Sequence, residues 1–242
     1  MATVEVSNDG AVMTIRFNRP EKKNALTLEM YDRFADALGA AEADDATAVV
    51  VITGTGDAFC AGNDLNDFLA GTTLKGPSPQ ARLISALATF AKPLLAAVQG
   101  VAVGIGVTML LHCDLVYASP TARFKTGFAD LGVCPEAGST VLLPARVGQL
   151  AANELLLRNL VVSAEEAQRL GLVGAVMDEV AAATHGIATE LSLKPRDGLR
   201  TTKALLRQAR GPLEDAIAAE NREFGRLIQS PEFAAAAKAL LR

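Results

Sequence analysis

One carboxylate stands apart from the other acidic residues of this sequence. Glu136 follows a proline in the segment Gly132-Val-Cys-Pro-Glu-Ala-Gly-Ser139, and most of its neighbours are small. Proline followed by an acidic residue commonly begins a helix, because the fixed φ of proline suits the first turn and a carboxylate favours the positive end of the helix dipole. A carboxylate in such a turn can also serve as a general acid or base. The local sequence favours the helix start, so the rest of the chain has to decide.

Two further segments could do chemistry with backbone N–H groups instead of side chains. Phe59-Cys-Ala-Gly-Asn-Asp-Leu65 and Gly100-Val-Ala-Val-Gly-Ile-Gly106 each lead from an expected strand into an expected helix. The first N–H groups of a helix have no helical carbonyl to bind. Two such donors that converge on one point form an oxyanion hole, which stabilises a developing negative charge by several kcal/mol. For either segment alone, close packing is the simpler explanation of the glycines.

Other familiar catalytic motifs are missing. The chain has no G-x-x-x-x-G-K-[ST] phosphate loop, no G-x-S-x-G nucleophile elbow and no H-E-x-x-H zinc motif. Gly104-Ile-Gly106 lacks the third glycine of a dinucleotide fingerprint, because Met109 takes that place. Cys60, Cys113 and Cys134 are an odd number without metal-ligand spacing. We therefore expect no metal site and a reducing compartment.

The composition fits one globular domain, with a possible helical appendage, that acts on a small molecule. The 242 residues are 50% hydrophobic and 21% charged, with a net charge of −4. No run of lysine and arginine indicates nucleic acid, and no basic amphipathic segment indicates a membrane surface. The apolar stretch 94–111 is interrupted at Gln99-Gly100, so it predicts a buried strand, a turn and a helix rather than a membrane span. Without a secretory signal at its start, the chain is expected in the cytoplasm.

The pattern of apolar residues predicts alternating strands and helices in the first part of the chain. Beyond Ser139 the pattern is mostly helical, with an exception at 173–177. The segment 212–242 predicts two helices separated at Ser230-Pro231, whose apolar stripe must pack on the core or on another subunit. The expected strands are 4–7, 11–17, 48–53, 94–98 and 115–118; the expected helices are 28–43, a short one after Asn63, 81–91 and 104–111; the expected loops are 57–63 and 71–79.

Taken together, these segments resemble the crotonase (enoyl-CoA hydratase/isomerase) family along essentially the whole chain. The two glycine-containing segments are similar to the oxyanion-hole signatures of the family. The second lies within 92–106 and is followed by Cys113-Asp-Leu-Val-Tyr-Ala-Ser119. Asn18-Arg-Pro-Glu-Lys-Lys-Asn-Ala-Leu26 resembles its early coenzyme A contact. The resemblance implies an α/β fold, a crotonase (ClpP-like) spiral of ββα units, over residues 1–190 with the acyl-CoA site. Residues 191–242 would form a C-terminal helical trimerisation region that packs on the core or on a neighbouring subunit.

By this resemblance, the backbone amides of Asn63 and Ile105 are the oxyanion donors. A coenzyme A thioester is the substrate, and no separate cofactor is expected. The residues expected to contact the substrate or coenzyme A are Lys22, Lys23, Asn24, Ala25, Leu26, Ala61, Gly62, Asn63, Asp64, Leu65, Gly104, Phe128 and Leu131.

The acid/base positions distinguish between reactions of the family. A hydratase needs one group to activate water and another to deliver a proton. The positions that match its two glutamates hold Thr108 and Phe128, and neither exchanges protons usefully. The turn around Glu136 instead resembles that of peroxisomal-type Δ3,Δ2-enoyl-CoA isomerases, which need one carboxylate. Glu136 is thus the expected catalytic base, with its pKa raised toward neutrality by an apolar wall that includes Phe128, Leu131 and Val133.

Several alternatives stay open at this point. The protein could be an enoyl-CoA hydratase, a lyase, in which Glu136 or an aspartate such as Asp64 works with another partner, or a non-catalytic acyl-CoA binder. For Asp64 we prefer the role of N-cap of the helix at Leu65. The isomerases it resembles often carry an extra domain or an organelle address. We expect neither here, which favours a bacterial-like cytoplasmic enzyme of fatty acid metabolism and β-oxidation. The family resemblance also implies a homotrimer or a dimer of trimers.

Overall fold

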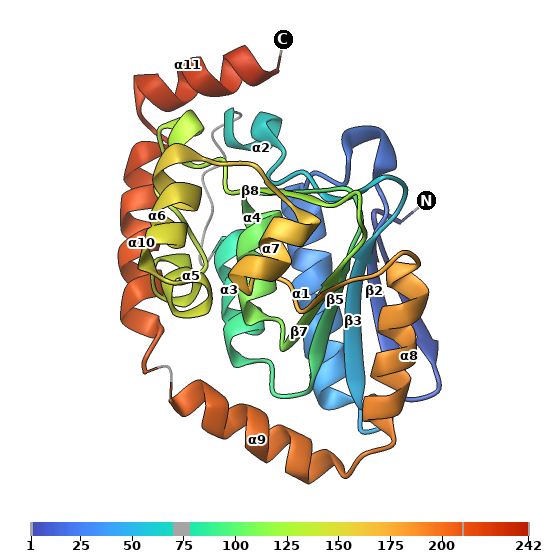
Figure 1. Cartoon of the computed structure of the whole chain (residues 1–242). Coiled ribbons are helices and arrows are strands. Elements are labelled where there is room, and N and C mark those ends of the chain that lie inside the picture. The colour runs from blue at the N-terminus through green and yellow to red at the C-terminus, as the bar shows by residue number, and fades with distance from the viewer. Residues whose placement is uncertain (1, 70–77, 210, 242) are drawn as a thin grey trace.

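The core of the molecule is a six-stranded sheet with the strand order β1-β2-β3-β5-β7-β10 (Figure 1). The computed structural model describes residues 2–69, 78–209 and 211–241. A hairpin joins β1 and β2, and all later neighbours in the sheet are parallel. Crossovers with helices connect these parallel strands, as an α/β fold requires. The bounds are β1 Val4–Asp9, β2 Val12–Phe17, β3 Val49–Gly54, β5 Leu94–Val98, β7 Leu115–Ala118 and β10 Ala175–Val176.

A second, four-stranded sheet repeats the order of the first. Its strands follow in the order β4-β6-β8-β9, namely Ala58–Cys60, Val101–Val103, Arg123–Lys125 and Val162–Ser163. In the chain, β4 follows β3, β6 follows β5 and β8 follows β7, and a helical segment comes after each of these pairs. Successive strand–strand–helix units therefore wind into a spiral, and the predicted fold class is confirmed.

Helices cover both faces of the large sheet. Helices α1 (Leu28–Ala43) and α3 (Pro79–Thr89) pack together on one face, and α8 (Val180–Ser192) lies on the other (Figure 1). The main apolar core lies under α1 and α3. Thr27 caps α1 as predicted, because its hydroxyl accepts a hydrogen bond from the Met30 N–H at 3.3 Å.

The apolar stretch 94–111 begins with a strand and ends with helical turns as predicted, but a second strand, β6, lies where only a turn was expected, and the α-helix is shorter. It holds β5 and β6, one turn of α-helix, α4 (Ile105–Thr108), and then a 3-10 helix, Met109–His112. No helix in the described ranges is long and apolar enough to cross a membrane. The predicted loop 57–63 is wrong in its first part, since β4 pairs there with β6. The predicted loop 71–79 lies almost entirely outside the described residues, and α3 begins at its last position.

The last part of the chain is helical and folds back over the core. Figure 1 shows α10 alongside α5 and α6, with α11 beside α2. The predicted break between two C-terminal helices is confirmed at Ser230, whose hydroxyl accepts from the Phe233 N–H at 3.1 Å. The remaining helices are α2 Leu65–Leu69, α5 Ser139–Val147, α6 Gln149–Arg158, α7 Ala164–Leu170, α9 Arg196–Gln208, α10 Glu214–Leu227 and α11 Pro231–Leu240, with 3-10 turns at Pro20–Lys22 and Ala129–Leu131.

The C-terminal apolar stripe is largely covered by the chain itself. Leu213 and Ile217 pack against the main core. Phe233 and Ala237 are buried in a smaller cluster with Phe128. Of the two partners that the sequence left open for this stripe, the core of the same chain takes most of it.

Candidate active site

The two glycine-containing turns lie side by side. Strands β4 and β6 are parallel neighbours, so the turns that follow them leave the same edge of the small sheet. A β-carbon placed on Gly104 would lie 3.9 Å from the Gly62 Cα, and Gly104 has a φ of 56°, which favours glycine. Among the described residues, the N–H groups of Asn63 and Ile105 have no hydrogen-bond acceptor. The expected oxyanion donors are thus neighbours with free N–H groups.

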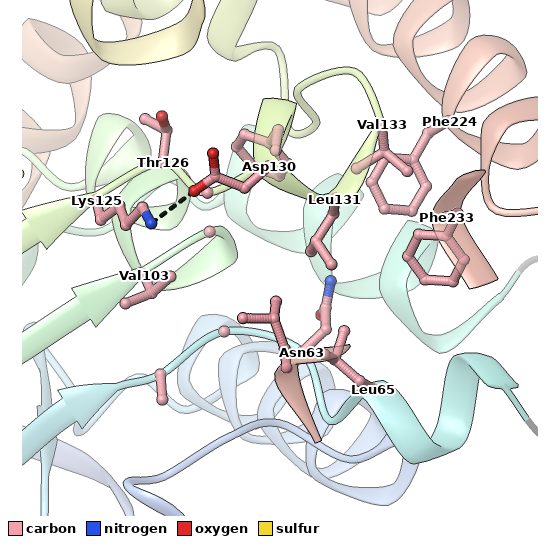
Figure 2. A pocket seen from close by; sticks show the side chains of 16 residues that line it. Asn63, Leu65, Val103, Lys125, Thr126, Asp130, Leu131, Val133, Phe224 and Phe233 are labelled. Atoms are coloured by element: carbon pink, nitrogen blue, oxygen red, sulfur yellow. Dashed lines mark ion pairs between the residues drawn. The ribbon is translucent and has the colours of Figure 1, made fainter. Parts of the chain in front are cut away.

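These turns open onto an apolar cavity of about 210 Å³. Figure 2 shows the ion pair between Lys125 and Asp130 on one side of it and the rings of Phe224 and Phe233 on the other. The Lys125 Nζ lies 2.6 Å from the Asp130 carboxylate. The lining residues come from both turns, from the segment after β8 and from the C-terminal helices: Ala61, Gly62, Asn63, Leu65, Val103, Gly104, Lys125, Thr126, Gly127, Phe128, Asp130, Leu131, Val133, Phe224, Phe233 and Leu240.

Glu136 is buried beside this cavity, and Asn63 links it to the lining. Glu136 is only 3% exposed, and one of its carboxylate oxygens, Oε1, has no hydrogen-bond partner among the described residues. Burial raises the pKa of Glu136 to about 7, the hydrogen bond from the Asn63 side chain opposes that shift, and the charge of Glu220 adds to it. This is the direction expected from the sequence. Asn63 lines the cavity, whereas Glu136 itself does not.

The orientation of the Asn63 side chain is fixed by Tyr31, a residue that the sequence analysis missed. The Tyr31 hydroxyl donates to Asn63 Oδ1, which leaves the Asn63 NH₂ group to donate to Glu136. Burial, followed by the charges of Glu136 and Cys60, raises the pKa of Tyr31 well above its usual value, so the phenol stays protonated. In the sequence, Tyr31 lies at an apolar position of the helix at 28–43, and no motif marks its hydroxyl.

The two positions that match the glutamates of hydratases lie inside the protein but cannot ionise. Thr108 is on α4, and its buried hydroxyl has no partner among the described residues. Phe128 is buried and lines the cavity. Leu131 and Val133 line it as well. That these side chains form an apolar wall around Glu136 itself stays a prediction.

The segment 22–26 lies against the first glycine-containing turn. The Ala61 N–H donates to the Lys23 carbonyl at 2.9 Å, and Leu26 forms a parallel bridge with Asn63. Asn24 is fully buried, and its amide donates to the carbonyls of Thr55 and Ala58 at 3.0 and 2.7 Å.

The side chains of Asn24 and Leu26 therefore support the turn instead of facing a ligand. Lys22 and Lys23 are exposed, and Ala25 is half-buried. A coenzyme A contact by this segment would have to use these three residues or the backbone.

Asp64 acts as the expected cap. Its Oδ1 accepts from the Asn66 N–H at 3.0 Å, and its Oδ2 lies 2.7 Å from the Arg19 guanidinium. Burial raises the pKa of Asp64, but the hydrogen bonds from Arg19 and Asn66 outweigh that effect and lower it. A carboxylate held in this way is a poor proton carrier near neutral pH.

The two buried cysteines are poorly suited to nucleophilic chemistry. Burial raises the pKa of the Cys60 and Cys113 thiols to about 12, which keeps them protonated. Within the described parts of the chain, no group of three or more His, Cys, Asp or Glu side chains could hold a metal ion.

A spiral of strand–strand–helix units with two adjacent glycine-containing turns at the edge of its small sheet defines the crotonase superfamily. The chain belongs to the enoyl-CoA hydratase/isomerase family, whose model matches residues 7–241. It is thus an enzyme of that family, in which acyl-CoA thioesters are the substrates.

Relatives named for both kinds of reaction are similar to this chain. It is 36% identical to 1,2-epoxyphenylacetyl-CoA isomerase of Escherichia coli, over 89% of this chain and 86% of that one. It is 39% identical to rat (Rattus norvegicus) enoyl-CoA delta isomerase 2, over 84% of this chain but only 54% of the relative. A probable enoyl-CoA hydratase, EchA14 of Mycobacterium tuberculosis, is 36% identical over 96% of this chain and 94% of its own length.

Solved structures agree in fold over the whole chain. An enoyl-CoA hydratase/isomerase from Pseudoalteromonas atlantica is 37% identical with a TM-score of 0.96, and the match covers 99% of this chain and 97% of that one. Pseudomonas aeruginosa OdaA is 39% identical with a TM-score of 0.96, and the match covers both chains fully.

Proposed function

We propose that the protein isomerises 3-enoyl-CoA to 2-enoyl-CoA, with Glu136 as the single acid/base group. The observation that carries this proposal is the buried carboxylate next to the Asn63 turn, with a pKa of about 7 and one oxygen unpartnered among the described residues. A group with a pKa near the working pH can both accept and return a proton. That is what a double-bond shift with one carboxylate requires.

The proposed reaction has two proton transfers and no net change in composition. The N–H groups of Asn63 and Ile105 donate to the thioester oxygen. Glu136 takes a proton from C2, and the electron pair of that C–H bond moves onto the thioester as an enolate, which the two donors stabilise. The enolate electrons then form the C2=C3 bond, the C3=C4 electrons take the proton back from Glu136 at C4, and the conjugated thioester leaves. The transfers need no metal and no redox cofactor.

The substrate would enter by way of the cavity. We propose that the apolar lining around Phe128 and Leu131 takes the acyl chain, and that the segments 22–26 and 61–65 with Gly104 face coenzyme A. Asn63 lines the cavity and Glu136 does not, so a side-chain rearrangement on binding that lets Glu136 reach C2 belongs to the proposal.

Hydration is the second candidate reaction, because hydratases occur among the relatives and Asp130 lines the cavity. Asp130 would have to supply the second acid/base group. The hydrogen bond from Lys125 comes first among the influences that lower the pKa of Asp130, so this side chain stays ionised and cannot deliver a proton near neutral pH. The single-carboxylate reaction is therefore the better fit.

Product analysis of the wild-type protein tests the proposal. Purified protein is given a 3-enoyl-CoA in one experiment and a 2-enoyl-CoA in another, and the thioesters are separated and identified. Conversion of the first substrate to the conjugated 2-enoyl-CoA, without conversion of the second to 3-hydroxyacyl-CoA, is the expected result. Formation of 3-hydroxyacyl-CoA as the main product would identify a hydratase, and tight binding without turnover would identify an acyl-CoA binder.

A further inference from the structure

The second peptide group after Glu136, between Ala137 and Gly138, is held at both of its ends. On one side, His112 Nε2 is 2.8 Å from the Ala137 carbonyl oxygen, and since a carbonyl only accepts, the imidazole donates. On the other side, the Gly138 N–H donates to Glu220 Oε2 at 2.6 Å. The carbonyl and the N–H belong to the same peptide group, between Ala137 and Gly138.

This peptide group lies in an unusual backbone conformation. Ala137 has a φ of 65° and Gly138 has a φ of 70°. For alanine the left-handed region is unfavourable, so such a conformation persists only where the surroundings impose it. The two side chains that hold the peptide group are therefore part of what fixes the direction of the Glu136 side chain.

Glu220 reaches this loop from α10, far along the chain. Its side chain also accepts from the Thr140 N–H at 2.9 Å and from the Thr140 hydroxyl at 2.5 Å. The residue is only 5% exposed, and among the described residues no lysine or arginine pairs with it. A buried carboxylate with only neutral donors is costly unless those donors are well placed, and here they come from the N-terminal turn of α5.

We propose that Glu220 is a positioning residue for Glu136: it clamps the Ala137–Gly138 peptide group from α10 and so holds the Glu136 carboxylate against the oxyanion turns. This inference rests on the proposed function of Glu136. By this proposal, helix α10 both covers the core and positions the group that transfers the proton.

The charge of Glu220 has a separate consequence, because its negative charge raises the pKa of Glu136. Removal of that charge is therefore expected to lower the pKa of Glu136 and to move the acid limb of the activity profile to lower pH. The titratable and polar groups that face Glu136 or its loop are Tyr31 on α1, Asn63 after β4, Cys60 on β4, His112 before β7, Cys134 in the loop itself and Glu220 on α10.

The first test compares Glu220→Gln with Glu223→Gln. Glu223 lies on the same helix, is exposed and pairs with Arg226, so it is a matched control. An amide cannot accept from both Gly138 and Thr140, since one end of it donates. For Glu220→Gln we expect kcat for 3-enoyl-CoA to fall about 10- to 100-fold, as for a misplaced catalytic group, with KM within about twofold. The acid limb should also move to lower pH, while Glu223→Gln matches wild type. An unchanged kcat and acid limb would overturn the proposal.

A second measurement does not depend on turnover or on the identity of the substrate. The Glu136 carboxyl can be titrated by ¹³C NMR with labelled glutamate, and its signal is assigned by its absence in Glu136→Gln. A lower midpoint in Glu220→Gln than in wild type shows that the Glu220 charge acts on Glu136, and an unchanged midpoint contradicts that part of the proposal. If wild type does not isomerise 3-enoyl-CoA, the proposed function fails, but this titration still decides whether Glu220 acts on Glu136.

A milder variant covers the case in which Glu220→Gln does not fold. Thr140→Val removes one hydrogen bond to Glu220 and keeps its charge. We expect a smaller fall in kcat with the acid limb in its wild-type place. Wild-type kcat in Thr140→Val would show that the donors around Glu220 do not position Glu136.

Discussion

At the scale of single residues, the buried Glu136 carboxylate lowers the free energy of unfolding of the protein when it is ionised. Burial raises its pKa from the usual 4.5 to about 7, so between these two pH values the folded protein binds more protons than the unfolded chain. The free energy of unfolding contributed by this group therefore falls as pH rises through that window. Below the window the group is protonated in both states and the cost disappears.

Replacement of Glu136 by glutamine should therefore stabilise the protein at alkaline pH. We expect Glu136→Gln to raise the free energy of unfolding by about 3 kcal/mol at pH 8, from a shift of roughly 2.5 pKa units, and by little at pH 4. Denaturant unfolding of both proteins at the two pH values measures the difference. An equal effect of the substitution at both values would mean that Glu136 is not buried as a charged group.

Removal of the Asn63 side chain should shift the pH dependence of activity in the opposite direction from removal of the Glu220 charge. The Asn63 amide donates to Glu136 and lowers the pKa of that carboxyl, so Asn63→Ala should raise the pKa and move the acid limb of kcat/KM to higher pH. The backbone N–H of the residue remains. Tyr31→Phe removes only the hydroxyl that orients the amide, so it should shift the limb the same way by less. A limb that stays in place in both variants would contradict the Tyr31–Asn63–Glu136 chain.

Sequence alone marked the atoms expected to react but not the groups that orient them. The turns with Asn63 and Ile105 and the isolated Glu136 stood out through local motifs. Tyr31 looked like one more apolar position of a helix, and Glu220 contacts a loop 82 residues earlier in the chain. Neither contact leaves a periodic or spacing signal, because it exists only once the chain is folded.

At the scale of elements, the turn between β6 and α4 depends on close approach to β4. A β-carbon on Gly106 would lie 2.5 Å from the carbonyl oxygen of Cys60. Gly106→Ala should therefore displace the Ile105 turn and destabilise the protein by about 1–3 kcal/mol, as overpacking does. Thermal unfolding measures this.

Gly39→Ala is the matched control on α1, because its β-carbon would meet nothing within 4 Å. It should leave stability unchanged or raise it by up to about 1 kcal/mol, since alanine favours a helix over glycine. If both substitutions had the same effect, the close approach at Gly106 would not matter.

The predictability of each element depends on its length. The helix at 28–43 and the β-branched strands of the large sheet run long enough to show their periods, and they are found within a residue or two of their predicted places. Strands β4, β6 and β8 have three residues each. Three residues cannot show alternation, and tertiary pairing alone makes them strands.

At the scale of the whole molecule, large apolar side chains remain uncovered on α6 and just after it. Leu150 is 82% exposed and Leu157 is 73% exposed, and their spacing of seven residues places them on one face of the helix. Val161 follows and is 56% exposed. The predicted homotrimer or dimer of trimers would cover this face, since the C-terminal stripe is already largely packed.

Leu157→Glu should therefore lower the molecular mass of the assembly in sedimentation velocity. Leu193→Glu is the control, because Leu193 is 82% exposed but lies at the end of α8. A wild-type protein that sediments as a monomer, or an assembly that Leu157→Glu leaves intact, would contradict this assignment.

The division of the chain into regions 1–190 and 191–242 stays a prediction as well.

The central claim is that one carboxylate, Glu136, moves the proton. The most direct measurement is the rate of 3-enoyl-CoA isomerisation by wild type and by Glu136→Gln at pH 8, with thioester binding measured in parallel. The account predicts a loss of at least about 10²-fold in kcat, typical for a missing general base, with binding retained. A fully active Glu136→Gln protein would show that another group carries the proton.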